Sequence, residues 1–278
     1  MSKLKEKSSL LMQYTLIAFC CLVIVLPIMI LLVASFKSNI EFANTSVFQF
    51  AETLNFDNYL TVLKRGKFFL ALKNTCLILL FSVLINVMIG TMLSYALSRL
   101  QFRLKRLIIF LILAARVIPT ITTQVATFKI VQGLGFYDTL AAPILLYASS
   151  DVIQVFLYLR FIESIPYSID ESAIIDGASH YRICWSVIFP LMKPAIVTSV
   201  ILRAVHIYND MYIPYLYLPS STHRVVSTAI MSFCGSNQGA QIPLLAAAFI
   251  IVMLPMVILY LFSQRLIFDG LTTGAVKE

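Results

Sequence analysis

Six long apolar runs dominate the chain, and short polar segments separate them. Each run is long enough to cross a bilayer, since about 20 apolar residues span the hydrocarbon core as a helix. Backbone groups inside a membrane must bond one another, so such runs predict helices. We therefore predict an all-α membrane protein with six transmembrane helices. The predicted spans cover approximately residues 10–36, 68–98, 107–130, 140–161, 191–218 and 242–262.

The polar stretch between the fourth and fifth runs predicts two short helices joined by a tight turn. Ser168 is a good N-cap, and Glu171 three residues later would complete a capping box. Gly177 is expected to end the first helix because glycine readily adopts a positive φ. Ser179 can cap the second helix, which Pro190 should stop or bend. A polar helix–turn–helix between two membrane spans is expected to contact a soluble partner.

This polar stretch, residues 166–190, resembles the "EAA" loop of binding-protein-dependent ABC importer permeases. The resemblance rests on the triplets Glu-Ser-Ala at 171–173 and Asp-Gly-Ala at 176–178, followed by a proline. It implies a type I ABC importer permease fold, in which this loop is the coupling helix that sits in a cleft of a separate ATPase. Ser172 stands where the family usually has Ala, and Cys184 where it usually has Phe. The residues that the resemblance assigns to ATPase coupling are Glu171, Ser172, Ala173, Asp176, Gly177, Ala178, Cys184 and Trp185.

Composition and charge support a polytopic membrane protein and argue against a nucleic-acid partner. Hydrophobic residues make up 60% of the chain and charged residues 12%, against roughly 45–50% and 25% in soluble domains. The net charge of +8 is spread over short loops, which is the positive-inside pattern. This pattern puts the basic loop at 99–106 and both termini in the cytoplasm. The first run is too long for a cleaved signal peptide, so we expect it to remain as a span.

The protein is expected in the cytoplasmic membrane of a bacterium or archaeon, with lipid around its spans. The predicted topology divides the chain into five parts. The core, at 68–265, holds spans two to six. The parts are a cytoplasmic N-terminus (1–9), the first span (10–36), an extracellular segment (37–67), the permease core (68–265) and a cytoplasmic C-terminal tail (266–278).

The second span carries small and polar positions that predict helix contacts. Gly90 and Ser94 are four residues apart and form a small-residue face suited to close helix packing. Asn74 and Asn86 are expected to make hydrogen bonds between helices rather than to bind a ligand.

Charged and polar residues also interrupt the predicted third, fourth and fifth spans. A charge at mid-span costs about 2.5–3.5 kcal/mol unless it faces a wet cavity or a partner. Arg116 and Asp151 could therefore pair across the bundle or line a substrate path, and the sequence leaves both open. The polar side of the fifth span suits a sugar, or else an aromatic belt at the outer interface. The candidate path residues are Arg116, Gln124, Asp151, Arg203, Tyr208, Asn209, Asp210 and Tyr212.

Other segments extend the resemblance towards sugar importers. Residues 132–139 and 206–218 are similar to family segments, and the tail at 264–277 closely resembles the ending of sugar permeases of the maltose-permease type. This implies a sugar as cargo, expected to be an oligosaccharide. The implied partners are a second, homologous permease chain in a heterodimer, two ATPase subunits and an extracytoplasmic sugar-binding protein. The outer loop at 219–241 would offer that protein a docking face.

The sequence predicts no chemistry on the chain itself. It holds no Gly-x4-Gly-Lys-Ser/Thr phosphate loop, no metal spacing among its five cysteines and no nucleophile–base pattern. We therefore expect no catalytic site and no cofactor here, with ATP and Mg²⁺ bound by the partner ATPase. The alternative function is a secondary transporter driven by an ion gradient, with Arg116, Asp151 and Asp210 as a relay. The absence of a visible inverted repeat disfavours that alternative.

Overall fold

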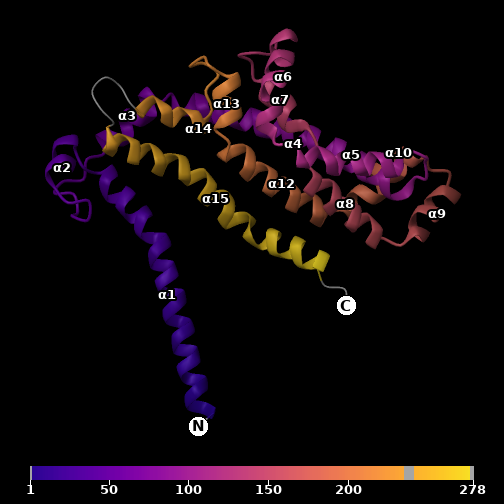
Figure 1. Ribbon diagram of the computed structural model, residues 1–278, viewed down its shortest axis with the longest axis horizontal. Helices are drawn as coiled ribbons and strands as arrows, with labels where there is room; N and C mark the ends of the chain where they lie inside the picture. The colour runs from indigo at the N-terminus through magenta and orange to yellow at the C-terminus, as the bar shows by residue number, and fades with distance from the viewer. Residues whose placement is uncertain (1, 235–240, 276–278) are drawn as a thin grey trace. The chain divides into compact units, whose positions relative to one another are not determined.

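The structure is a computed structural model that describes residues 2–234 and 241–275. Every regular element in these residues is helical, which confirms the predicted all-α class. In chain order the elements, labelled where there is room in Figure 1, are α1 (Ser2–Ser35), α2 (Asn39–Asn44), α3 (Asp57–Arg65), α4 (Phe68–Arg99), α5 (Lys105–Val117), α6 (Thr120–Gly133), α7 (Ala141–Ala148), α8 (Val152–Ser164), α9 (Tyr167–Ile175), α10 (His180–Ile183), the π-helical turn η1 (Cys184–Ile188), α11 (Phe189–Leu191), α12 (Lys193–Asn209), α13 (Tyr212–Tyr217), α14 (Val226–Ala229), the 3-10 turn η2 (Ile230–Phe233) and α15 (Ile242–Ala275).

The chain forms two compact units, of which the first contains the residues up to Phe69 together with Ala229–Pro255. In this unit, buried polar groups fix the chain where α1 ends. The side-chain amide of Asn58 donates to the carbonyl oxygens of Ser35 at 2.8 Å and Lys37 at 2.9 Å. Lys37 is fully buried, and its Nζ donates to the hydroxyl of Thr45 at 2.9 Å. The bond from Asn58 to Ser35 satisfies a carbonyl that the last turn of α1 leaves without a helical partner.

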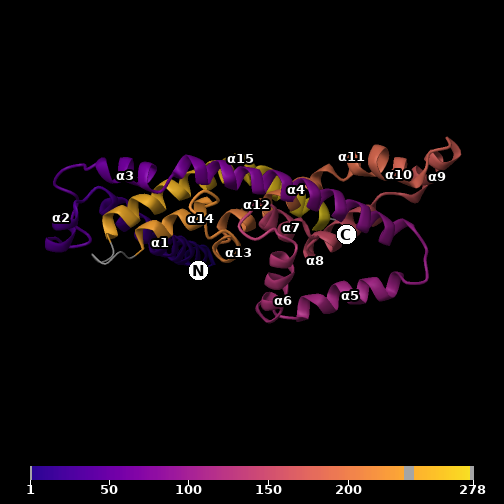
Figure 2. The ribbon, with the colours of Figure 1, turned by 90° about the horizontal axis from the view of Figure 1, so that it is seen from above.

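The second unit contains Leu70–Thr228 with the chain from Met256 onward, and its helices pack around α4. Gln154 of α8 lies over Gly90 of α4, where an added Cβ would be 2.7 Å from the Gln154 side-chain nitrogen. The hydroxyl of Ser94 donates to the carbonyl of Val155 at 3.3 Å. The predicted close contact at Gly90 and Ser94 is therefore confirmed. Figures 1 and 2 both show α9 and α10 near the same end of α4.

Three of the six predicted spans are broken rather than continuous. In the described residues, three helices are long and apolar enough to cross a membrane alone, namely Leu10–Ser35, Phe68–Arg99 and Ile242–Gln264. Three bent pairs pass the same test together: α5 with α6, α7 with α8 (45°), and α10–α11 with α12 (79°). The chain has up to six spans if each bent pair is counted as one. The predicted fifth span, 191–218, is wrong in extent because α12 ends at Asn209 and α13 begins at Tyr212.

Short polar residues account for two of these breaks. The carboxylate of Asp151 accepts a hydrogen bond from the backbone N–H of Ile153 at 2.7 Å and caps α8. The carboxylate of Asp210 accepts from the backbone N–H of Tyr212 at 2.8 Å, at the start of α13. A carboxylate at a helix N-terminus satisfies free N–H groups and complements the helix dipole. Apolar composition predicted the length of each span, whereas these capping bonds decide where a helix restarts.

The predicted start of the helix in the 166–190 loop is corrected. α9 begins at Tyr167 after Pro166, with no side-chain cap, so the predicted capping box of Ser168 and Glu171 does not form. Because the helix begins at Tyr167, Ser168 lies within the first turn and is no longer at the N-cap position that a capping box requires. A capping box does form at α2, between Ser38 and Glu41.

The last helix extends well past the predicted end of the sixth span. α15 continues to Ala275, so most of the predicted tail at 266–278 is helical. Residues 276–278 of that tail, and residues 235–240 of the predicted outer loop, lie outside the described residues.

Candidate functional site

The 166–190 loop forms a helix, a tight turn and a second helix, as the sequence predicted. The N–H of Gly177 donates to the carbonyl of Ile174, and that of Ala178 to Ala173, both at 2.9 Å. This pair of bonds is a Schellman motif, which requires a left-handed residue after the helix. Gly177 supplies it with φ +78°, and a Cβ there would meet nothing within 4 Å. Its conformation, not crowding, requires glycine, and Ser179 then caps α10 by accepting an N–H at 3.4 Å.

The second half of the loop bends sharply towards the next long helix. α10 continues through the π-helical turn Cys184–Ile188 into α11, and the axis then turns by 79° into α12. Pro190 and Pro194 stand in the first turns of α11 and α12. Proline lacks an N–H and is tolerated there, which explains a bend near Pro190 as predicted.

A buried ion pair fixes the loop to the end of α4, and sequence reasoning missed it. The guanidinium of Arg99 lies 3.1 Å from the carboxylate of Asp170, with side chains only 9% and 3% exposed. The same nitrogen of Arg99 donates to the carbonyl of Ile165 at 2.8 Å. The guanidinium carbon lies 5.5 Å from the ring centroid of Tyr167. Removing one partner of a buried ion pair costs about 3–5 kcal/mol, because it leaves the other charge buried and unpaired.

An apolar core beneath the loop contains one of the residues predicted to contact an ATPase. Cys184 is only 3% exposed and packs with Ile183, Ile188 and Tyr95. Trp185 is half-buried, and its ring centroid lies 5.1 Å from that of Phe189. The position where the sequence departs from the family pattern is therefore internal in this chain. Its side chain supports the loop and is not available at its surface.

The outer surface of the loop combines acidic and large apolar side chains. Glu171, Ser172, Asp176 and Gly177 are exposed, while Ala173 and Ala178 are half-buried against the core. Ile175 of the same turn is 85% exposed, and Tyr181 of α10 is 66% exposed. Large apolar groups grouped on a surface are typical of interaction sites. The arrangement fits a face that another protein covers.

The predicted path residues do not form a single cluster. Arg203 of α12 donates to the carbonyl oxygens of Tyr147 at 2.6 Å and Ser149 at 3.2 Å, where α7 ends. The hydroxyl of Tyr147 in turn donates to the carboxylate of Asp210 at 2.8 Å. These bonds join the break between α7 and α8 to the break between α12 and α13. Tyr147 was not predicted, because its apolar surroundings in the sequence give no signal of this role.

The other path candidates are more dispersed. The amide of Gln124 donates to the hydroxyl of Tyr217 at 2.9 Å. The side chains of Arg116, Asn209 and Tyr212 are exposed, and among the described residues no ion pair joins Arg116 to Asp151. Tyr208 is buried beside a cavity of about 10 Å³. That volume holds about one water molecule, far less than the 300–1,000 Å³ of small-molecule pockets.

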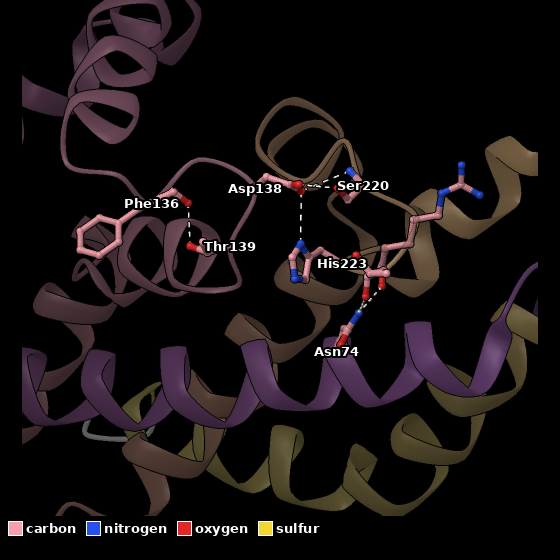
Figure 3. A network of polar contacts seen from close by, with 8 residues as sticks. Asn74, Phe136, Asp138, Thr139, Ser220 and His223 are labelled. Atoms are coloured by element: carbon pink, nitrogen blue, oxygen red, sulfur yellow. Dashed lines mark hydrogen bonds and ion pairs between the residues drawn. The ribbon is translucent and has the colours of Figure 1, made fainter.

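A polar network at the opposite end of α4 joins the turn between α6 and α7 to the 218–226 segment (Figure 3). The carboxylate of Asp138, in the turn between α6 and α7, accepts from the hydroxyl and the N–H of Ser220. It also lies 3.3 Å from Nδ1 of His223. The Ser220 hydroxyl is the main cause of a pKa of Asp138 below its ordinary value, with His223 adding to it. The amide of Asn74 on α4 donates to carbonyl oxygens of the same 218–226 segment.

Comparison with known proteins decides which family this architecture represents. A family model described as the binding-protein-dependent transport system inner membrane component matches residues 86–272, which include the whole 166–190 loop. The chain belongs to this family. The permease is 32% identical over 254 residues to the melibiose/raffinose/stachyose import permease protein MelC of Bacillus subtilis, covering 91% of each chain.

Two other relatives of this permease have named transport roles of their own. It is 33% identical over 227 residues to the trehalose transport system permease protein SugB of Mycobacterium tuberculosis, covering 81% of this chain and 83% of the relative. It is 27% identical over 280 aligned residues to the maltodextrin transport system permease protein MalD of Streptococcus pneumoniae, covering 99% and 98%.

A solved structure supports the fold of the permease. The crystal structure of a bacterial ABC transporter involved in the import of the acidic polysaccharide alginate contains a chain that matches with a TM-score of 0.83. The match covers 94% of this permease and 97% of that chain at 22% identity. The predicted type I ABC importer permease fold is therefore confirmed, with its third to fifth spans bent as described.

Proposed function

We propose that this permease is a membrane-spanning subunit of an ABC importer that moves a sugar, expected to be an oligosaccharide, into the cell. The relatives named above are import permeases for melibiose, raffinose and stachyose, for trehalose and for maltodextrin, which supports a carbohydrate as cargo. The observation that carries the proposal is the 166–190 loop. It is anchored on α4, turned at Gly177 and exposes Ile175 and Tyr181 beside Glu171.

The energy for transport would come from other subunits. Two ATPase subunits would bind and hydrolyse ATP with Mg²⁺, each permease chain would offer its loop to one of them, and this chain would carry no cofactor. Closure of the ATPases would move the loops and shift the spans between inward-open and outward-open states, as a population shift. Glu171, Ser172 and Asp176 would contact the ATPase surface. Cys184, which is buried, would support the loop from beneath.

The topology follows from this assignment. The loop must face the ATPases, so the basic 99–106 loop and both termini are proposed to be cytoplasmic. The outer segments at 37–67 and 219–241 would face the extracytoplasmic sugar-binding protein. A solved structure of similar fold is that of a bacterial alginate ABC transporter in complex with alginate pentasaccharide-bound periplasmic protein, which supports such a partner.

The sugar would pass along a surface of this chain that a second, homologous permease chain completes. Buried Tyr208 borders a cavity of only about 10 Å³, too small for a sugar ring. The exposed candidates Arg116, Asn209 and Tyr212 remain suitable for lining a shared path, with Gln124 half-buried nearby in sequence. Asp151 and Asp210 already bond helix N-termini, which disfavours an ion relay through them.

The substitution Gly177→Val tests the coupling role. A β-branched residue is strained at φ +78°, so the turn between α9 and α10 should shift while membrane insertion continues. The assay is ATP hydrolysis and uptake of raffinose, trehalose and a maltodextrin by proteoliposomes holding both permease chains, the ATPases and the binding protein. We expect at least a tenfold lower uptake per ATP hydrolysed. Gly133→Val is the matched control, because a Cβ at Gly133 also meets nothing within 4 Å and its φ is ordinary.

Normal uptake by Gly177→Val at normal expression would refute the coupling role. Uptake by the wild-type permease that needs no ATPase subunit would refute the proposed function as a whole.

A further inference from the structure

Both ends of one helix hold segments that face a partner under the proposed function. At one end of α4, Arg99 binds the carboxylate of Asp170 and the carbonyl of Ile165, on either side of the start of α9. One turn earlier, the hydroxyl of Tyr95 lies 3.3 Å from Nδ1 of His180, at the start of α10. α4 therefore contacts both helices of the 166–190 loop. Tyr95 and Arg99 are mostly buried in these contacts.

The other end of α4 holds the outer 218–226 segment. Asn74 is 5% exposed, and its amide donates to the carbonyls of Thr222 at 3.0 Å and Arg224 at 2.9 Å. The hydroxyl of Thr75 accepts the backbone N–H of Val226 at 3.0 Å. These are buried bonds to backbone groups far away in the sequence. Figure 3 shows Asn74 reaching from α4 to the segment that also binds Asp138.

α4 between these two anchors is an unbroken helix. Asn74 and Arg99 are about 38 Å apart along its axis, at 1.5 Å per residue, which exceeds the hydrocarbon thickness of about 30 Å. The neighbouring bent pairs each contain a break at which motion could be absorbed. An unbroken helix with hydrogen-bonded ends transmits displacement, whereas a broken one can flex at its break.

We infer that α4 transmits displacement between the 218–226 segment and the 166–190 loop of this permease, with Arg99 and Asn74 as the positioning residues at its two ends. A displacement of the outer 218–226 segment, imposed by the loaded binding protein, would move α4 and, through Arg99, tilt the 166–190 loop on its ATPase. The inference rests on the proposed function and assigns roles to residues that contact neither partner. The contacts of Asn74 and of Arg99 are both needed to pass the displacement along α4, so the loss of either interrupts the same transmission.

The test uses the complete transporter in proteoliposomes, with the binding protein saturated with whichever of raffinose, trehalose or maltotriose it retains. Arg99→Met removes the ion pair and the bond to Ile165, and Asn74→Leu removes two bonds at similar volume. The matched controls are Arg103→Met and Lys73→Met, which change exposed basic residues next to the same anchors. Basal ATP hydrolysis per assembled complex and its stimulation by the loaded binding protein are measured for each.

We expect stimulation, taken for each variant as the ratio of its loaded rate to its own basal rate, to fall by about fivefold or more in both test variants, the lower end of usual coupling between sites. The double variant should lose no more than the worse single variant, because losses at two contacts that serve the same transmission are not additive. Both controls should be stimulated like the wild type.

Three results would overturn the inference. These are full stimulation of either test variant, a proportional fall in basal and stimulated rates, and additive losses in the double variant. If Arg99→Met fails to assemble with the ATPases, Arg99→Lys takes its place under the same criteria, since its ammonium keeps the charge but not the paired geometry. A wild-type complex that shows neither stimulation nor uptake would instead refute the proposed function.

Discussion

Adding a single methyl group at Gly90 tests the packing of α4 against α8. An ideal Cβ at Gly90 would lie 2.7 Å from Nε2, 2.9 Å from Cδ and 3.2 Å from Oε1 of Gln154. Contacts below 3.0 Å are not tolerated, so Gly90→Ala must displace the Gln154 amide. Gln154 is only 6% exposed, and its amide donates to the carbonyl of Asn86 at 3.3 Å. The substitution therefore moves a buried polar group away from its partner.

The expected cost combines overpacking with the weakened hydrogen bond. Inserting a methyl group into a packed core costs about 1–3 kcal/mol. The bond to Asn86 is long, so its loss adds at most about 1 kcal/mol. For a chain of this size, 1 kcal/mol lowers the melting temperature by about 2–4 °C. Alanine favours helix over glycine by about 1 kcal/mol at either position, so the comparison is with a helical glycine that has free space around it. Relative to Gly133→Ala, Gly90→Ala should thus lower the apparent Tm of the purified permease by about 2–16 °C.

The measurement is thermal denaturation in detergent, followed by the loss of monodisperse protein. Gly133→Ala is the matched control, because a Cβ at that position meets nothing within 4 Å and alanine favours helix. Gln154→Ala removes the obstructing side chain and supplies a second test. In the double variant the new methyl group no longer clashes, so Gly90→Ala should cost less than in the wild-type background, by about 0.5–3 kcal/mol.

Two outcomes would refute this reasoning. Equal stability of Gly90→Ala and Gly133→Ala would mean that the helices are not this close. Strict additivity of Gly90→Ala and Gln154→Ala would mean that the two residues do not share the space between α4 and α8.

Three further predictions concern the loops. The lowered pKa of Asp138 adds stability that is fully present well above the ordinary value of 3.8, so Asp138→Asn should reduce Tm at pH 7. The difference from wild type should shrink progressively as the pH falls below 3.8 towards the lowered pKa, and a difference that stays constant down to the lowest pH at which the protein is folded would contradict this. Maleimide labelling compares two variants that each keep a single thiol, one with Ser172→Cys and one with native Cys184. The thiol at 172 should be labelled and Cys184, which is 3% exposed, should not. Equal labelling rates would show that the core beneath the loop is open to the reagent. Asn58→Leu should lower the free energy of unfolding by about 1–3 kcal/mol and speed proteolysis of the 37–56 segment, because the bonds to Ser35 and Lys37 are lost. Asn44→Leu, at an exposed position, should do neither, and equal proteolysis of both variants would contradict the prediction.

The helix–turn–helix of the 166–190 loop was largely predictable, because local rules decide most of it. Gly177 takes a positive φ and Ser179 caps α10, both as expected from residue type alone. The capping box at Ser168 and Glu171 failed because the helix starts after Pro166, two residues earlier than it would after a Ser168 cap. The same motif does form at Ser38, so the rule holds but its site depends on the neighbouring residues.

The supports of the loop could not be predicted, since they lie far away in the sequence. Arg99 was assigned to a basic cytoplasmic loop, and nothing local indicated that it pairs with Asp170. Asp151 and Asp210 were named among the path candidates, with pairing across the bundle left open for Asp151, and the structure adds that each bonds the start of a helix. Whether a charged group in an apolar run caps a helix or lines a cavity depends on where the backbone breaks.

Local reasoning from the amino-acid sequence was enough to predict the all-helical class, up to six candidate spans and the helix–turn–helix that carries the family pattern. These follow from residue counts against bilayer thickness and from capping rules, which act over a few residues. Only the tertiary structure decided that three spans are bent, that Cys184 is internal and that α4 carries an anchor at each end. Such features depend on which distant groups satisfy one another once water is excluded, and no local pattern encodes those partners.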